Sequence, residues 1–141
     1  MTFQPLPTIT EDTAPFWEGG AVGELRINRC RACRVWFHPP APVCPECLSV
    51  DVGPEVASGR ATVAAYTINV QPWAPDMEVP YVLAIVELDD QRDVRLMTRM
   101  VDCAPDEISV GMPVVVTFQH VDEIWLPLFR PATADAARAL S

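Results

Sequence analysis

The sequence predicts a mainly β protein with a short N-terminal helix, a four-cysteine ribbon and a five-stranded barrel. Two Cys-x-x-Cys pairs, Cys30/Cys33 and Cys44/Cys47, are separated by ten residues. Five apolar or alternating segments typical of strands follow between residues 62 and 129. The 141 residues, of which 50% are apolar, suffice for one compact domain with a small appendage. We expect an N-terminal arm with a helix (1–22), the ribbon (23–54), the barrel (55–131) and a C-terminal tail (132–141).

The net charge and the length of the apolar runs argue against two kinds of partner. The formal net charge is -9, and all 10 basic residues are arginines. Binding to nucleic acid depends on neutralising phosphates, so this charge argues against it. No apolar run approaches the ~20 residues of a membrane-spanning helix, and the first residues lack the pattern of a secretory signal. We therefore expect a cytoplasmic protein without nucleic-acid or membrane partners.

A short helix is predicted over Thr13–Glu18, ahead of the cysteines. Its first residue is of a helix-capping type, Pro15 suits the first turn, and Gly19-Gly20 would end the helix. So short a helix is stable only against another surface. Its aromatic residues, Phe16 and Trp17, are therefore expected to pack on the body of the protein or to contact a partner.

The four paired cysteines predict a metal centre. Each Cys-x-x-Cys pair can direct two sulfurs to one point, so Cys30, Cys33, Cys44 and Cys47 can complete a tetrahedron around Zn²⁺ at about 2.3 Å per bond. Four thiolates leave no position for water or substrate, so the metal would be structural. Iron is an alternative, because it suits the same ligands. Disulfides would need an oxidising compartment, and His38 is a weaker candidate ligand because four cysteines fill the shell.

Basic residues gather around the first cysteine pair. Arg26, Arg29, Arg31 and Arg34 lie close to it in a chain that is acidic as a whole. These arginines either offset the net negative charge of a zinc centre with four thiolates or bind an anion or a partner. The sequence leaves both roles open.

Alternation of apolar and polar residues marks the barrel strands. Strands are expected at 62–70, 81–88, 94–101, 113–121 and 124–129. The fourth is expected to turn Val114, Val116 and Phe118 inward. The OB-fold is the commonest five-stranded closed sheet of this size, and it is the fold class that we predict. We expect the barrel to fold on a core of its own, whereas the ribbon should depend on its metal.

The segment Gln71–Pro80 joins the first two barrel strands. It contains three prolines and carries Trp73 and Met77 with little polar cover. A loop of this length in a compact domain is usually functional or disordered. We interpret Trp73 and Met77 as part of a binding surface.

The sequence contains no recognisable catalytic set. The two histidines, His38 and His120, do not belong to a nucleophile motif, and the six glycines form no phosphate-binding loop. The fifth cysteine, Cys103, is interpreted as a small apolar residue. The chain alone is therefore not expected to be an enzyme. A single-stranded nucleic-acid-binding module and a rubredoxin-like electron carrier are alternatives, since zinc ribbons and OB-folds occur in the first and an iron site with four cysteines in the second.

The order of these motifs resembles a bacterial and archaeal family with a rubredoxin-like zinc ribbon and an OB-fold, formerly a domain of unknown function and now called acyl-CoA-associated. The shared motifs are Phe16-Trp17, Cys30-x-x-Cys33, Pro39-Pro40, Cys44-Pro45-x-Cys47, Ser58-Gly59-Arg60, Pro80-Tyr81-Val82, Gly111-Met112-Pro113-Val114 and Pro127-x-Phe129-Arg130-Pro131. The resemblance covers residues 13–131. The chain departs from it at Arg34 and Leu48, where the family usually has glycine after each cysteine pair, and at Ala61.

The resemblance implies a non-catalytic accessory subunit. Similar proteins accompany thiolase-fold enzymes, including sterol-carrier-type thiolases and aldolases of steroid side-chain breakdown, or hotdog-fold enoyl-CoA hydratases. In such complexes the OB-fold domain supports the catalytic subunit and helps to form an acyl-CoA channel or pocket. The candidate contacts to a partner or to acyl-CoA are Phe16, Trp17, Arg29, Arg31, Trp73 and Met77.

Overall fold

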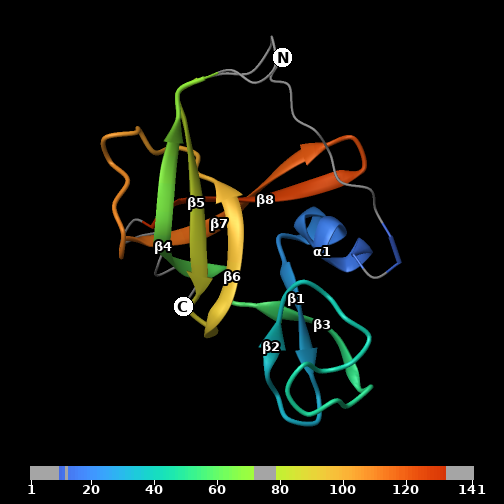
Figure 1. Cartoon of the computed structure of the whole chain (residues 1–141). Helices are drawn as coiled ribbons and strands as arrows, with labels where there is room; N and C mark the ends of the chain where they lie inside the picture. The colour runs from blue at the N-terminus through green and yellow to red at the C-terminus, as the bar shows by residue number, and fades with distance from the viewer. Residues whose placement is uncertain (1–9, 12, 72–78, 133–141) are drawn as a thin grey trace.

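The computed structural model describes residues 10–11, 13–71 and 79–132. Within them the chain is mainly β, as predicted. Figure 1 shows a small three-stranded sheet beside a curled five-stranded sheet, with the helix close to both. Two of the predicted contacts, Trp73 and Met77, and nearly all of the predicted tail lie outside the described residues.

The first sheet forms the ribbon. Helix α1 (Ala14–Glu18) and a 3-10 turn, η1 (Gly19–Val22), precede the strands β1 (Leu25–Cys30), β2 (Trp36–Phe37) and β3 (Val52–Ala57). The strand order is β2-β1-β3, and both pairs are antiparallel. β1 and β2 thus form a hairpin around the first cysteine pair. β3 crosses the expected limit between residues 54 and 55, and the division into domains stays a prediction.

The second sheet contains the barrel strands. They are β4 (Arg60–Asn69), β5 (Tyr81–Leu88), β6 (Gln91–Arg99), β7 (Pro113–Val121) and β8 (Ile124–Pro131). The antiparallel order β6-β5-β4-β7-β8 curls until β6 meets β8. There Met100 and Phe129 form a single parallel bridge, and the Val101 N–H donates to the Phe129 carbonyl at 2.9 Å. The five-stranded OB-fold prediction is confirmed.

Alternation places most barrel side chains correctly. On β6 the alternating residues Val94, Leu96 and Thr98 are buried, and so is Met100 directly after the strand. On β7, Val114 is buried as expected, while Val116 and Phe118 pack partly buried against the core. Val115 is also buried, which alternation does not predict. It pairs with Arg60 on one side and Arg130 on the other, and such long side chains on the same face cover a small neighbour.

The N-terminal α-helix ends at Glu18, before Gly19-Gly20, as predicted. A 3-10 turn, η1, follows it directly, and the chain leaves the helical conformation at Gly23, whose φ of 74° is left-handed. Gly20 is needed for close packing, because a Cβ there would lie 2.5 Å from the Trp125 Cβ. Thr13 occupies the N-cap position, as predicted, but its hydroxyl makes no cap bond and instead accepts the Thr10 N–H at 2.9 Å.

Ribbon and barrel share one hydrophobic core. Phe16 of α1, Leu25 and Ile27 of β1, and Trp36 of β2 belong to the same buried cluster as the barrel residues. The Trp36 backbone is also held by Gln91, whose amide oxygen accepts the Trp36 N–H at 2.9 Å and whose nitrogen donates to the Trp36 carbonyl at 2.8 Å. The core is therefore continuous, contrary to the expectation that the barrel packs on its own.

None of the described helices has the length and apolar character needed to cross a membrane.

Candidate metal centre and apolar groove

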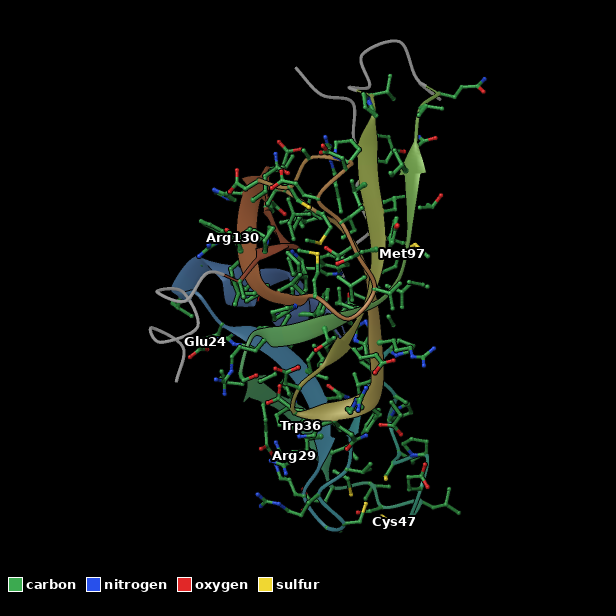
Figure 2. The ribbon with its side chains drawn as sticks, turned by 90° about the vertical axis from the view of Figure 1, so that its left-hand side faces the viewer. Glu24, Arg29, Trp36, Cys47, Met97 and Arg130 are labelled. Carbon is green, nitrogen blue, oxygen red and sulfur yellow. The ribbon has the colours of Figure 1, made fainter. Side chains whose placement is uncertain are left out.

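The four predicted ligands meet at the end of the ribbon that lies away from the barrel. The sulfurs of Cys30, Cys33, Cys44 and Cys47 all lie within 4.8 Å of one another. The Cys30 and Cys47 sulfurs are 3.6 Å apart, as are those of Cys33 and Cys44. A tetrahedron with bonds of about 2.3 Å places sulfurs about 3.8 Å apart. Figure 2 shows Cys47 at this tip and Trp36 nearer the barrel. The sulfur geometry therefore fits a tetrahedral metal.

Backbone N–H groups point at the two buried sulfurs. The Cys33 N–H donates to the Cys30 Sγ at 3.4 Å, and the N–H groups of Glu46 and Cys47 donate to the Cys44 Sγ at 3.3 and 3.4 Å. Such bonds stabilise a negative charge on sulfur, as metal-bound thiolates require. The two knuckles thus supply the electrostatic support that the ligands need.

The sulfurs differ in how easily they ionise. The backbone N–H of Cys33 lowers the pKa of Cys30 to about 6. At Cys33 the backbone N–H of Val35 favours the thiolate, but burial and the neighbouring sulfurs outweigh it and raise the pKa to about 12. Four thiolates this close repel one another, so a cation between them is needed for all four to ionise. The donor set therefore fits a divalent metal with soft-ligand affinity.

The residue after each knuckle has a left-handed backbone. Arg34 has φ 72° and Leu48 has φ 65°, and each donates its N–H to the carbonyl of the first cysteine of its pair, Cys30 or Cys44, at 2.9 and 3.0 Å. These are the two positions where the sequence departs from the family pattern of glycine. A side chain in this conformation costs about 1–2 kcal/mol.

Replacing Leu48 by glycine should therefore stabilise the protein. We expect Leu48→Gly to raise the free energy of unfolding by about 1 kcal/mol, since relief of the left-handed strain exceeds the extra entropy of glycine in the unfolded chain. Urea unfolding measures the change. Gly23→Ala, at φ 74° and with open space around it, is the reciprocal control and should lose a similar amount. Equal stability of Leu48→Gly and the wild type would contradict this account.

Two of the predicted contact residues, Arg29 and Arg31, form ion pairs within the chain. Arg29 lies 3.6 Å from the Glu55 carboxylate and over the Trp36 ring, 4.6 Å from its centroid. Arg31 lies 3.2 Å from the Asp51 carboxylate. Both carboxylates come from the chain after the second knuckle. The structure thus places Arg29 and Arg31 on the ribbon, where neither lines the groove described next.

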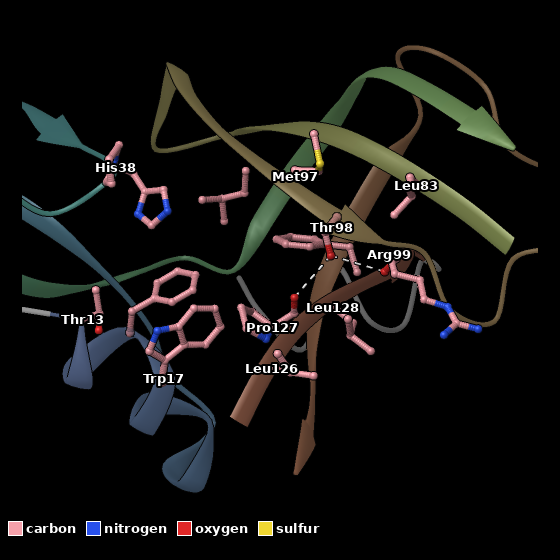
Figure 3. A pocket seen from close by; sticks show the side chains of 14 residues that line it. Thr13, Trp17, His38, Leu83, Met97, Thr98, Arg99, Leu126, Pro127 and Leu128 are labelled. Atoms are coloured by element: carbon pink, nitrogen blue, oxygen red, sulfur yellow. Dashed lines mark hydrogen bonds between the residues drawn. The ribbon is translucent and has the colours of Figure 1, made fainter. Parts of the chain in front are cut away.

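A large apolar groove opens between the N-terminal helix and the barrel. Its volume is about 760 Å³, within the range of small-molecule sites. Figure 3 shows its walls, built from α1, the segment after β2, and strands β5, β6 and β8. The lining residues are Thr13, Phe16, Trp17, His38, Pro39, Leu83, Leu96, Met97, Thr98, Arg99, Leu126, Pro127, Leu128 and Phe129. The predicted contacts Phe16 and Trp17 therefore meet here, edge to face at 4.7 Å between ring centroids.

His38 lies in the groove wall and not at the cysteines. Its ring is 4.9 Å from that of Phe16, and its buried Nδ1 has no hydrogen-bond partner among the described residues. Burial lowers the pKa of His38, which keeps the imidazole neutral. A neutral imidazole with an unsatisfied nitrogen is a suitable hydrogen-bond anchor for a polar atom on an otherwise apolar ligand.

The residues that the barrel contributes to the groove have no recognisable signal in the sequence. Leu83, Leu126 and Leu128 alternate like ordinary strand residues, and only the curling of the sheet brings their strands to one opening. The groove offers no catalytic pair: its described lining contains one histidine and one arginine, but no carboxylate or thiol. Burial raises the pKa of the fifth cysteine, Cys103, and His120 stacks on Trp125 with centroids 4.1 Å apart.

A four-cysteine ribbon joined to an OB-fold barrel defines the class of protein. Family models confirm both parts: residues 17–52 match the rubredoxin-like zinc ribbon domain of ChsH2, and residues 55–119 match the C-terminal OB-fold domain of ChsH2. Among solved structures, the chain superimposes on the Ltp2-ChsH2(DUF35) aldolase with a TM-score of 0.81 and 42% identity, covering 91% of this chain and 100% of that one. The chain belongs to the DUF35 family of ChsH2-type proteins.

Curated relatives include both enzyme subunits and a scaffold. A probable enoyl-CoA hydratase alpha subunit of Thermomonospora curvata is 43% identical over 130 residues, 92% of this chain and 40% of the relative. The 3-oxo-4,17-pregnadiene-20-carboxyl-CoA hydratase alpha subunit of Mycobacterium tuberculosis is 38% identical over 112 residues, 79% of this chain and 35% of the relative. This chain thus spans less than half of either. A DUF35 domain-containing scaffold protein of Methanocaldococcus jannaschii is 32% identical over 97 residues, 67% of each chain.

Proposed function

We propose that the protein is a non-catalytic, zinc-binding accessory subunit of an acyl-CoA-processing complex of the thiolase or steroid side-chain aldolase type. It stabilises the catalytic partner and helps to form the acyl-CoA site. One observation carries the proposal: nearly the whole chain has the fold of a chain in the Ltp2-ChsH2(DUF35) aldolase. A hotdog-fold hydratase subunit is the other candidate partner, because two relatives are named as hydratase alpha subunits.

The groove supports a role in holding an acyl group. Its walls are mainly leucine and aromatic side chains. The His38 Nδ1, which has no hydrogen-bond partner in the part of the chain that the structure describes, offers a polar anchor within them. An acyl group needs such an apolar wall, while the reaction itself needs acid–base or nucleophilic groups. The proposal assigns the catalytic groups to the partner subunit and the apolar wall to this chain.

The metal supports the fold and takes no part in the reaction. Cys30, Cys33, Cys44 and Cys47 would hold Zn²⁺, which supplies four bonds that fix both knuckles and the segment between them. Iron would make the protein a rubredoxin-like electron carrier, and the oxidised protein would then be red. A colourless protein with about one zinc per chain would exclude that alternative.

The test is to purify the tagged chain from its native host and to determine the mass of the intact complex, its metal content and the identity of its partner. We expect a stoichiometric thiolase-fold or hydratase subunit whose turnover of an acyl-CoA thioester falls when this chain is omitted. A chain that purifies alone, and that binds single-stranded oligonucleotides with strong salt dependence, would contradict the proposal and favour a nucleic-acid-binding module.

The groove is tested in the reconstituted complex. Trp17→Ala should weaken acyl-CoA binding by about tenfold, because it removes an aromatic wall while leaving partner binding intact. Val22→Ala, an exposed apolar residue of the same N-terminal segment outside the groove, is the matched control and should leave affinity unchanged. Equal affinity for Trp17→Ala and the control would exclude the groove as the acyl site.

A further inference from the structure

The outer face of the first three barrel strands is apolar at its centre. Cross-strand pairing places Thr67 beside Leu83, and Ala65 and Met97 on either side of Ile85. An antiparallel sheet with one face on the core normally presents polar residues outward. Here Met97 is 75% exposed, and a hollow of about 190 Å³ lies between these residues. Figure 2 shows Met97 on β6, on the side that faces away from the barrel interior. We call this surface the outer sheet face.

Arginines flank the outer sheet face at both ends. At one end, Arg92 and Arg95 lie 3.5 and 3.2 Å from the Glu87 carboxylate, with side chains 84% and 61% exposed, whereas Glu87 is only 16% exposed. At the other end, the Arg99 guanidinium lies 5.2 Å from the centroid of the Tyr81 ring. Arg92 and Arg95, which share one shielded carboxylate, therefore present positive charge to solvent at their end of the face, on a chain whose net charge is -9.

This arrangement indicates a protein partner with carboxylates around an apolar contact. An apolar centre with a charged rim is the usual anatomy of a protein–protein interface, and charge complementarity fixes the register. A second copy of this chain would bring the same arginines together, and each copy already carries a charge of -9. Single-stranded nucleic acid stacks on aromatic platforms. The hollow at the centre of this face is lined mainly by aliphatic side chains and Met97, with Tyr66 as the single aromatic residue among its lining residues.

We propose that the outer sheet face is the docking surface for the catalytic subunit, which contributes an apolar contact surrounded by acidic side chains. The inference rests on the proposed function. The face is continuous with the groove, because Leu83 and Met97 line both the groove and the hollow. A subunit docked on the face therefore borders the groove, so that the two chains form the walls of one acyl-CoA site.

The experiment uses the catalytic subunit that purifies with the tagged wild-type chain. It measures the affinity of this subunit for the purified wild type and for variants of the chain. Met97→Glu should weaken binding by about 30-fold or more, since it places a charge at the apolar centre opposite acidic side chains. Arg95→Glu should weaken binding less at high salt than at low salt. Val50→Glu is the matched control: Val50 is 79% exposed on the ribbon, and the variant should bind like the wild type. Unchanged circular dichroism of each variant shows that it is folded.

The outcomes separate this inference from the proposed function. If the catalytic subunit binds the Met97→Glu variant as tightly as the wild type, or if Val50→Glu weakens binding instead, the outer sheet face is not the docking surface. The accessory role of the protein then still stands. A wild-type chain that binds no catalytic subunit overturns the proposed function itself. The inference is also overturned if the wild type is a dimer and Met97→Glu converts it to a monomer. The same holds if the wild type binds oligonucleotides and both Met97→Glu and Arg95→Glu reduce that affinity.

Discussion

Cys44→Ser is expected to release the metal, unfold the ribbon and lower the stability of the barrel with it. Structural zinc in small sites contributes on the order of 10–16 kcal/mol of apparent binding free energy, comparable with the whole stability of a domain. The ribbon residues Leu25, Ile27 and Trp36 belong to the same hydrophobic core as the barrel residues. Loss of the ribbon would therefore expose barrel side chains to water. Zinc analysis, tryptophan fluorescence and thermal unfolding followed by circular dichroism measure the three effects.

The control for this substitution is Cys103→Ser. Cys103 is partly buried outside the metal centre, so the variant should keep about one zinc per chain and unfold close to the wild-type temperature. Addition of a strong chelator to the wild type should reproduce the Cys44→Ser behaviour. A Cys44→Ser variant whose barrel still melts at the wild-type temperature would show that the shared core does not couple the two parts.

Phe129→Ala is expected to destabilise the protein by about 3–5 kcal/mol, the usual cost of removing a large buried aromatic side chain. Phe129 is 0% exposed, and its backbone makes the isolated bridge to Met100, just after the end of β6. The substitution leaves a cavity at the point where the barrel closes. Since a typical domain has only about 5–15 kcal/mol of net stability, a large part of the protein should be unfolded in mild denaturant. Urea unfolding gives the value.

Two variants calibrate this prediction. Phe129→Leu keeps most of the buried apolar volume and should lose markedly less than the alanine variant. Met97→Ala removes an exposed side chain and should change the free energy of unfolding by less than about 0.5 kcal/mol. If Phe129→Ala were no less stable than Met97→Ala, the barrel would not depend on closure at this point.

The metal ligands could be predicted because their chemistry is local. Cys30, Cys33, Cys44 and Cys47 lie in two short motifs whose spacing alone directs the sulfurs to one point, and the structure brings all four together. Strand alternation on β6 was equally local. Three pairs of the second sheet, β4–β5, β5–β6 and β7–β8, join consecutive strands, whereas the β4–β7 pair and the closure at Phe129 join segments far apart in the chain.

The groove could not be predicted, because it depends on contacts between distant segments. The sequence pattern around Leu83, Leu126 and Leu128 would be the same in a closed barrel and in an open sheet. The ion pairs of Arg29 and Arg31 could not be predicted either, because their carboxylate partners, Glu55 and Asp51, come close only when β3 pairs with β1. Gly20 illustrates the same limit, since its contact with Trp125 has no signal in the local sequence.

The segment between the two knuckles links the metal to the groove. His38 and Pro39 lie between Cys33 and Cys44, so a wall of the groove belongs to a loop that the metal closes at both ends. If metal binding orders this wall, occupation of the groove and occupation of the cysteines are thermodynamically linked, and each must tighten the other by the same factor. A chain without zinc, whose ribbon unfolds, would then also lose its affinity for a ligand of the groove, and a ligand bound there would protect the metal against chelators.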